Sequence, residues 1–294
     1  MEIKQQYSFQ TDAPVVQQQL KDSTNYIIEY DKSQPQVYCV IYFSSNDLYY
    51  PNNESTFKSV IIDKNRFEWY GNRVAKGYKH IFIRDVRKQW YVGGISAEIN
   101  SPKKMLDFLR EETKGYQTVF LGSSAGGFAA IIYGQLLSAK YILSFNGQFE
   151  VLSLLAQSNE KKDPLLYRYS SDPEHLPYFD STNFIVNPSS IFYFHSMKSK
   201  WDAEQNEFVK AFNINRIKFN SNNHGLPFYR FNLANVINFD EAKLNLLTKQ
   251  KQINPLLFSF RIIGVFNTLI NLVNLYVGYA FKLSVRKIKK FFTS

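Results

Sequence analysis

The stretch VFLGSSAGGFAA at residues 119–130 joins an apolar run to a segment that favours a helix. The run ends at Gly122, two serines follow, and Gly126 and Gly127 come before the remainder of the helical segment. An ordinary turn rich in glycine and serine would explain this pattern without any chemistry. The alternative is a nucleophile elbow, the strained turn between a strand and a helix that exposes a reactive serine. The segments on either side of the stretch distinguish the two explanations.

Those neighbouring segments alternate between strand-like and helix-like patterns. Runs of β-branched and aromatic residues bounded by turn formers predict strands. They lie at 25–31, 36–45, 80–86, 116–122, 139–147, 189–196 and 214–221. Apolar residues at helical spacing predict helices at 101–113, from the elbow to about Leu137, and at 202–212. Because such alternation indicates a mostly parallel sheet with helices on both faces, it predicts, together with the elbow, an α/β-hydrolase fold.

The same pattern of segments predicts the domain organisation. We expect one catalytic domain at 1–245, in which the loop-rich segment 151–188 is an insertion or a lid. We expect an amphipathic helical tail at 255–294 to follow it. Cys39 is the single cysteine, which excludes an intramolecular disulfide framework and a cysteine-based zinc site, and we expect no bound metal. The N-terminal residues lack a signal-peptide pattern, so we expect a cytoplasmic protein.

The charge of the chain is concentrated at its C-terminal end. The formal net charge is +10, yet no acidic residue follows Glu241. Nine basic residues do follow it, which leaves 26 basic against 25 acidic residues in 1–241. The body is therefore close to neutral, which argues against nucleic-acid binding, and the basic end is a local electrostatic feature.

The basic end also carries an apolar segment. Residues 262–281 contain no charge, and a polar stripe of asparagines with Gly278 runs along one helical face at Asn267, Asn271 and Asn274. The opposite face consists of Phe266, Ile270, Val273, Val277 and Ala280. This pattern is typical of a helix that lies in a membrane interface or pairs with another helix, whereas a helix packed on the domain is the alternative.

The residues that end the chain favour the membrane. Lys287, Lys289 and Lys290 offer cations to anionic headgroups, and Phe291 and Phe292 offer apolar rings to the acyl boundary. We therefore expect peripheral attachment to the inner face of the cell membrane.

A predicted strand before the elbow and a predicted helix after it support a nucleophile motif at this turn. Gly122-Ser123-Ser124-Ala125-Gly126 matches G-x-S-x-G between a predicted strand and a predicted helix. Ser124 is the candidate nucleophile, and Ser123 is expected to pack or to donate a hydrogen bond from outside the reaction. Gly122, Gly126 and Gly127 are expected to be structural, because neighbouring chains leave no room for side chains there.

A serine nucleophile needs a histidine base, and in this fold the base follows the last of the three strands concerned. The chain has four histidines. His80 precedes the serine, His175 lies in the insertion, and His195 lies inside a predicted strand, where we expect a packed core side chain. His224 follows the strand at 214–221 and stands beside a glycine, so it is the candidate base.

The acid that orients the base should follow the preceding strand. Asp202 is the candidate, and Glu204 is the alternative; Asp202 could instead cap the helix that begins there. The oxyanion hole should use the backbone N–H of Ala125 together with one from the loop after the early strand, at Ser44 or Ser45.

These features resemble a group of bacterial α/β-hydrolase-fold proteins from surface-polysaccharide loci, which includes capsular polysaccharide O-acetyltransferases. The resemblance covers about residues 36–235 and is carried by FSSN, FIRD, LGSSAGG and the late Asp and His-Gly. It implies acetyl transfer from acetyl-CoA to a polysaccharide hydroxyl through an acyl-serine, with Ser124, Asp202 and His224 as the triad. It also implies a place at the inner-membrane surface or beside membrane-bound polysaccharide assembly proteins.

Two other function classes stay open at this stage. One is a carboxylesterase, deacetylase or lipase that uses the same triad with water as the acceptor. The other is a non-catalytic protein of polysaccharide assembly or export that keeps the fold as a scaffold. The triad residues do not separate transfer from hydrolysis, because the difference lies in whether water or an alcohol reaches the acyl-enzyme first.

Overall fold

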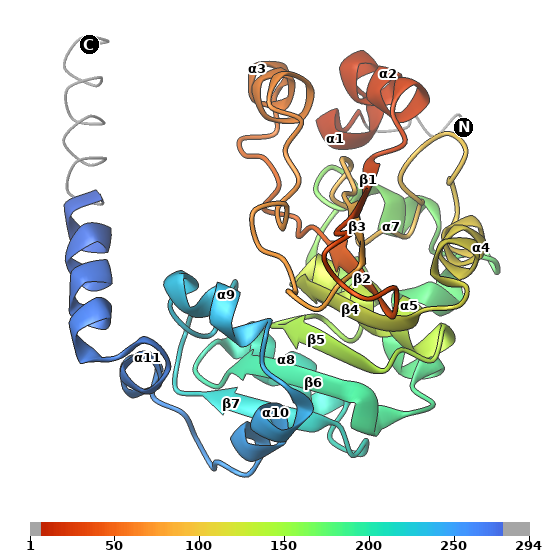
Figure 1. Cartoon of the computed structure of the whole chain (residues 1–294). Coiled ribbons are helices and arrows are strands. Elements are labelled where there is room, and N and C mark those ends of the chain that lie inside the picture. The colour runs from red at the N-terminus through yellow and green to blue at the C-terminus, as the bar shows by residue number, and fades with distance from the viewer. Residues whose placement is uncertain (1–6, 279–294) are drawn as a thin grey trace, which may run out of the picture.

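The computed structural model describes residues 7–278 and contains one seven-stranded sheet (Figure 1). The strands are β1 (Tyr26–Tyr30), β2 (Tyr38–Phe43), β3 (Lys79–Ile83), β4 (Gln117–Ser123), β5 (Tyr141–Phe145), β6 (Ile191–Ser196) and β7 (Asn215–Phe219). Their order across the sheet is β1-β3-β2-β4-β5-β6-β7. Only β1 pairs antiparallel, with β3, and every other neighbouring pair is parallel. All seven strands predicted from the sequence are confirmed.

The helices cover both faces of this sheet and one end of it. They are α1 (Phe9–Asp12), α2 (Pro14–Asp22), α3 (Glu54–Phe57), α4 (Pro102–Thr113), α5 (Ala125–Leu136), α6 (Leu154–Gln157), α7 (Pro164–Arg168), α8 (Lys200–Phe208), α9 (Leu233–Val236), α10 (Glu241–Thr248) and α11 (Pro255–Ile263). A π-helical turn extends α3 over Lys58–Asp63, and four short 3-10 turns lie in the loops. This is the α/β-hydrolase fold that the sequence predicts.

Alternate residues of the central strands divide the core into two layers. Cys39, Ile41 and Phe43 of β2 face a cluster that includes residues of α4 and α5. Val40 and Tyr42 face a second cluster that includes residues of α9, α10 and α11. A strand buried on both faces reads as a continuous apolar run, and this is why VYCVIYF contains no polar alternation. Because the strands from β2 to β7 run parallel, they all end at one edge of the sheet, and the loops that follow them meet there.

The C-terminal segment divides at Gly264. Before it, α11 packs on the body, because Phe258 is buried in the second cluster against Phe219 and Phe228. The tail predicted from residue 255 therefore begins with a helix that belongs to the body. After Gly264, which has a φ of 81°, a second helix covers 265–278 and stands beside the body, at the left of Figure 1.

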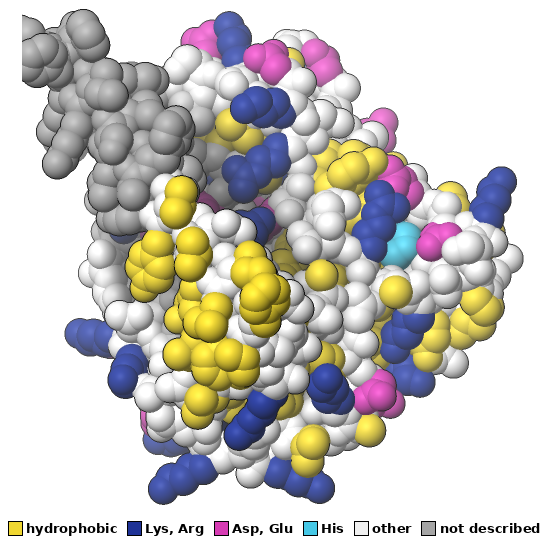
Figure 2. All heavy atoms as spheres, turned by 60° about the vertical axis from the view of Figure 1, so that its left-hand side comes forward, with side chains coloured by type: hydrophobic (Ala, Val, Ile, Leu, Met, Phe, Trp, Pro, Cys, Tyr) yellow, Lys and Arg dark blue, Asp and Glu magenta, His cyan; other side chains and the backbone are white. Residues whose placement is uncertain are grey.

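The helix over 265–278 is apolar on its outer surface. Figure 2 shows hydrophobic side chains gathered on the face of the molecule that comes forward from the left-hand side of Figure 1. Within residues 7–278, no helix has both the length and the apolar character needed to cross a bilayer. The predicted lipid-contacting residues Lys287, Lys289, Lys290, Phe291 and Phe292 lie outside the described residues.

Candidate active site

Ser124 occupies a strained corner between β4 and α5. Its φ of 50° and ψ of −121° lie in a region of backbone conformation that residues other than glycine rarely adopt. The corner is crowded, because a Cβ on Gly122 would lie 2.3 Å from the Gly126 backbone, and one on Gly126 would lie 2.2 Å from the Phe43 carbonyl oxygen. Small residues are therefore required on both sides of the serine, and the close contact holds Ser124 at the edge of the sheet.

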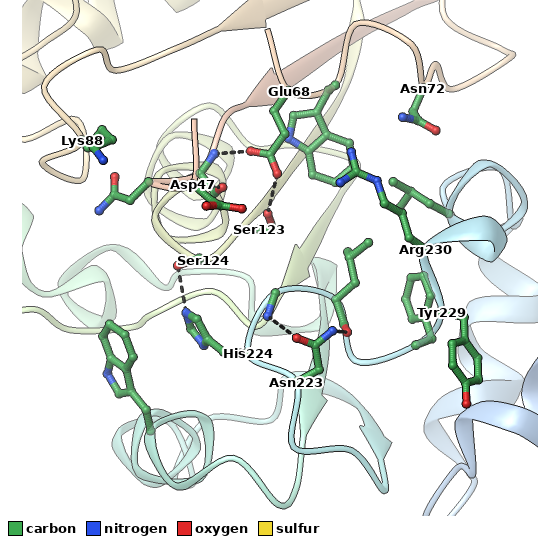
Figure 3. A pocket seen from close by; sticks show the side chains of 18 of the residues that line it. Asp47, Glu68, Asn72, Lys88, Ser123, Ser124, Asn223, His224, Tyr229 and Arg230 are labelled. Carbon is green, nitrogen blue, oxygen red and sulfur yellow. Dashed lines mark hydrogen bonds between the residues drawn. The ribbon is translucent and has the colours of Figure 1, made fainter. Parts of the chain in front are cut away.

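Ser124, His224 and Asp202 form a continuous hydrogen-bonded chain. Ser124 Oγ lies 3.0 Å from His224 Nε2, and His224 Nδ1 lies 2.7 Å from Asp202 Oδ1 (Figure 3 shows the serine–histidine contact). Because a carboxylate accepts only, Nδ1–H donates to Asp202, and Nε2 is left to accept the serine proton. Asp202 is 1% exposed, so its charge is directed at the imidazole rather than at water. The structure thus brings together the three residues that the sequence singles out.

Each partner residue comes from the segment that follows its strand. Asp202 lies in the first turn of α8, after β6, but it does not cap that helix, because the cap is Ser199. Glu204, the alternative acid, is exposed and lies 3.8 Å from Lys200, away from the imidazole. The geometry therefore favours Asp202 over Glu204 as the orienting acid.

The loop that carries His224 is fixed by contacts from two strands. Asn146 Nδ2 and Ser196 Oγ both donate to the backbone carbonyl oxygen of Asn223, at 2.9 and 2.6 Å. The indole of Trp201 stacks on the His224 ring with centroids 4.8 Å apart and planes 15° apart. No sequence pattern singles out Trp201, although it stands directly before the candidate acid.

The remaining histidines have structural positions. His80 contacts the Tyr42 hydroxyl and the Gly77 carbonyl oxygen, and His175 contacts Asp172. His195 is buried and stacks on Tyr193, as expected of a core side chain. Its burial lowers the pKa of the imidazole to about 4, and the neighbouring Lys218 acts in the same direction.

The backbone donors expected for the oxyanion hole are only partly free. The Ala125 amide lies at the first position of α5, where backbone N–H groups lack a partner within the helix. The Ser44 amide donates to the Ile83 carbonyl oxygen at 2.9 Å, and the Ser45 amide donates to the Glu68 carboxylate. The structure therefore does not present the Ser44 or Ser45 amide to an acyl group, because the sheet and Glu68 already engage them.

A side-chain amide that the sequence analysis missed lies beside the nucleophile. Gln148 Nε2 is 3.3 Å from Ser124 Oγ and 3.4 Å from His224 Nε2, and the residue is fully buried. The orientation of this amide is fixed, because the indole N–H of Trp90 donates to Gln148 Oε1 at 3.1 Å. Since the indole can only donate, it turns the NH₂ group of Gln148 toward the serine.

The loop that supplies Trp90 is held in an unusual backbone conformation. Lys88, Trp90 and Tyr91 have φ values of 59°, 53° and 63°. Asp85 fixes this loop, because its carboxylate accepts hydrogen bonds from the backbone N–H groups of Gln89 and Tyr91 at 2.8 and 3.1 Å. Strained backbone of this kind persists only where surrounding contacts hold it in place. Here it places the Trp90 indole within hydrogen-bond distance of Gln148.

Ser124 opens into a cavity of about 1260 Å³. In the view of Figure 3, Lys88 lies to the left of Ser124, Asp47 lies above it, and Arg230 and Tyr229 lie to the right. Burial lowers the pKa of the Lys88 ammonium to about 8, although Asp47 and Asp85 oppose that shift.

Within residues 7–278, no group of three or more His, Cys, Asp and Glu side chains could hold a metal ion.

Comparison with known proteins finds similarity among solved structures alone. No protein-family profile and no curated protein sequence matches the chain. The capsule O-acetyltransferase of Neisseria meningitidis serogroup A has 15% identity, with 65% of this chain and 78% of that chain covered and a TM-score of 0.43.

Two hydrolases are similar to a comparable degree. Esterase B of Lactobacillus rhamnosis has 13% identity, with 83% of this chain and 85% of that chain covered and a TM-score of 0.44. The S-formylglutathione hydrolase of Agrobacterium tumefaciens has 11% identity, with 76% and 88% covered and a TM-score of 0.43. These structures include a capsule O-acetyltransferase, the class of protein that the sequence resemblance names.

Proposed function

We propose that this chain is a serine acyltransferase that moves an acetyl group from acetyl-CoA to a hydroxyl of a capsular or other surface polysaccharide. The observation that carries the proposal is the hydrogen-bonded chain from Ser124 through His224 to buried Asp202, placed on a strained elbow at the wall of a large cavity. A serine whose hydroxyl contacts an oriented imidazole is activated for attack on an acyl carbon.

The reaction then proceeds in two half-steps. In the first, His224 Nε2 accepts the Ser124 proton as Oγ attacks the thioester carbon, and the same proton passes to the departing CoA sulfur. In the second, Nε2 accepts a proton from the acceptor hydroxyl, whose oxygen attacks the acyl-serine carbon, and Ser124 recovers its proton. Negative charge on the carbonyl oxygen is stabilised by the Ala125 amide and by the Gln148 NH₂ group.

The size of the cavity supports transfer rather than hydrolysis alone. Sites for one small molecule occupy about 300–1,000 Å³, whereas this cavity occupies about 1260 Å³ and extends to both sides of the serine. A transferase must hold a donor and an acceptor at the same nucleophile. The cavity lining includes the stacked rings of Tyr229 and Phe231 and the amide of Asn72, which are aromatic and amide groups that suit a sugar.

Carboxylesterase activity is the second candidate. The His224 side chain is 33% exposed, so water can reach the acyl-serine when no acceptor fills the cavity. Intact-mass measurement after mixing with acetyl-CoA, with and without a panel of purified capsular polysaccharides, tests both candidates. A stable acetyl adduct that one polymer discharges supports the transferase. Rapid turnover without any polymer selects the esterase, and the absence of both adduct and turnover contradicts acetyl-CoA as the donor.

A further inference from the structure

The helix over 265–278 exposes the apolar stripe that an ordinary surface helix would bury. Its outward side chains are apolar and 43–75% exposed; they are Val265, Phe266, Leu269, Ile270, Val273, Tyr276 and Val277. On the body side, Thr268 is fully buried, and Asn271 and Asn274 line the cavity that contains Ser124. A helix that packs on a globular body normally buries its apolar stripe and exposes its polar one. In this helix the apolar stripe is exposed, while Thr268 is buried and Asn267 and Asn274 are exposed as well, so the apolar face is available to another environment.

The exposed face is continuous and carries no charge. No Asp, Glu, Lys or Arg occurs from Ile262 to Gly278. Leu257 of α11 is also 51% exposed, and Figure 2 shows hydrophobic side chains gathered on this side of the molecule. Contiguous apolar surface of this kind on a soluble body marks a site of interaction with a protein or a membrane.

The shape of the face and the charge that follows it select a membrane. At about 100° per residue, these seven apolar side chains cover an arc of roughly 140°, which is wider than the narrow seam of a coiled coil. Beyond Gly278 the sequence adds five basic residues and no acidic one. A broad apolar face followed by cations is the combination that lies in the surface of an anionic bilayer.

We propose that residues 265–278 lie in the interface of an anionic bilayer with their apolar face among the acyl chains. The opposite face of the same helix then forms a wall of the catalytic cavity, through Asn271, Asn274 and Leu275. Tyr229 and Arg230 line the same cavity, so the cavity then borders the bilayer surface on the side of this helix. The acceptor is therefore a polyhydroxy headgroup carried on a membrane lipid; this second step rests on the proposed function.

Flotation with vesicles tests the docking step without any enzymatic readout. The full chain is compared with the triple variant Phe266→Asn, Val273→Asn, Val277→Asn, and Val186→Asn is the matched control because Val186 is 85% exposed on a distant loop. We expect the wild type and the control to float with phosphatidylglycerol vesicles and the triple variant to bind at least tenfold more weakly. High salt should reduce wild-type binding severalfold without abolishing it, because the apolar contribution is not screened.

Two outcomes overturn the docking step. One is equal flotation of the wild type and the triple variant, or no flotation of either, at matched melting temperature. The other is a wild-type dimer that the triple variant converts to a monomer while neither binds vesicles, which assigns the face to a contact between two copies of the chain.

A pair of fluorophosphonates tests the second step. One probe is short and soluble, and the other carries a long alkyl chain and is incorporated in the same vesicles. We expect the vesicle-held probe to label wild-type Ser124 at least tenfold faster than the soluble probe, and the triple variant to lose this preference while it reacts normally with the soluble probe. Equal rates for the two probes on vesicle-bound wild type overturn the membrane-carried acceptor alone. If neither probe labels Ser124, the proposed function fails whereas the flotation result stands.

Discussion

Replacing Gln148 tests whether a side-chain amide completes the oxyanion hole. Gln148→Met keeps the length of the side chain and removes both the donor 3.3 Å from Ser124 Oγ and the acceptor of the Trp90 indole. Methionine fits a fully buried glutamine site with little change in volume. The variant should therefore fold, at a cost of about 1–3 kcal/mol for the indole N–H left without a partner.

The expected loss of activity is larger than a neutral hydrogen bond would give. An ordinary hydrogen bond contributes about 1 kcal/mol, or about fivefold in rate. A donor to an oxyanion contributes about 2.7–4 kcal/mol, or about 10²–10³ in kcat. Because the Ser44 and Ser45 amides are engaged elsewhere, neither of these two backbone donors replaces Gln148. We expect kcat on a soluble activated ester to fall about 10²-fold with little change in KM.

The assay is steady-state hydrolysis of p-nitrophenyl acetate, paired with thermal unfolding of each variant. Trp90→Phe is the companion variant, because it removes the donor that orients Gln148 but leaves the amide in place, and its kcat should fall by a smaller factor. A Gln148→Met enzyme that is folded and keeps kcat within about twofold of the wild type would refute this assignment.

Three further changes have defined outcomes. Asp202→Asn should lower kcat by about 10⁴, whereas Glu204→Gln should leave it unchanged; the reverse result would show that the acid is misassigned. Burial lowers the pKa of His195 to about 4 from an ordinary 6.5. As the pH falls from 6.5 toward 4, the unfolded chain therefore binds a proton at this histidine that the folded chain does not bind. Denaturant titration should therefore show the wild type losing about 2 kcal/mol between pH 7 and 5 relative to His195→Phe, and equal losses would contradict the low pKa. Gly126→Ala places a Cβ against the Phe43 carbonyl oxygen, so calorimetry should show a lower Tm, and an unchanged Tm would mean that the elbow is less crowded than described.

Local patterns predict much of this fold and the three residues that meet in the site. Each strand is an apolar run that its own sequence defines, and the elbow glycines report a close approach that only glycine permits. The order of Ser124, Asp202 and His224 along parallel strands then places them at one edge of the sheet. These inferences need no knowledge of which distant residues touch.

The features that the sequence does not reveal depend on such distant contacts. Trp90 and Gln148 meet across 58 positions of the chain, and neither lies in a recognisable motif. The amide of Ser45 is engaged because Glu68 reaches it from a separate loop. Likewise, α11 belongs to the body because Phe258 packs in an aromatic cluster, and the sequence of α11 alone does not predict this contact.

Mapping the residue that reacts with a small soluble fluorophosphonate tests the central claim most directly, because such reagents react with serines activated by a histidine. Peptide mass spectrometry should place the label on Ser124 in the wild type, with labelling lost in Ser124→Ala and in His224→Ala and retained in Ser123→Ala. Labelling that persists in Ser124→Ala, or that moves to Ser123, would contradict the account of Ser124 as the nucleophile.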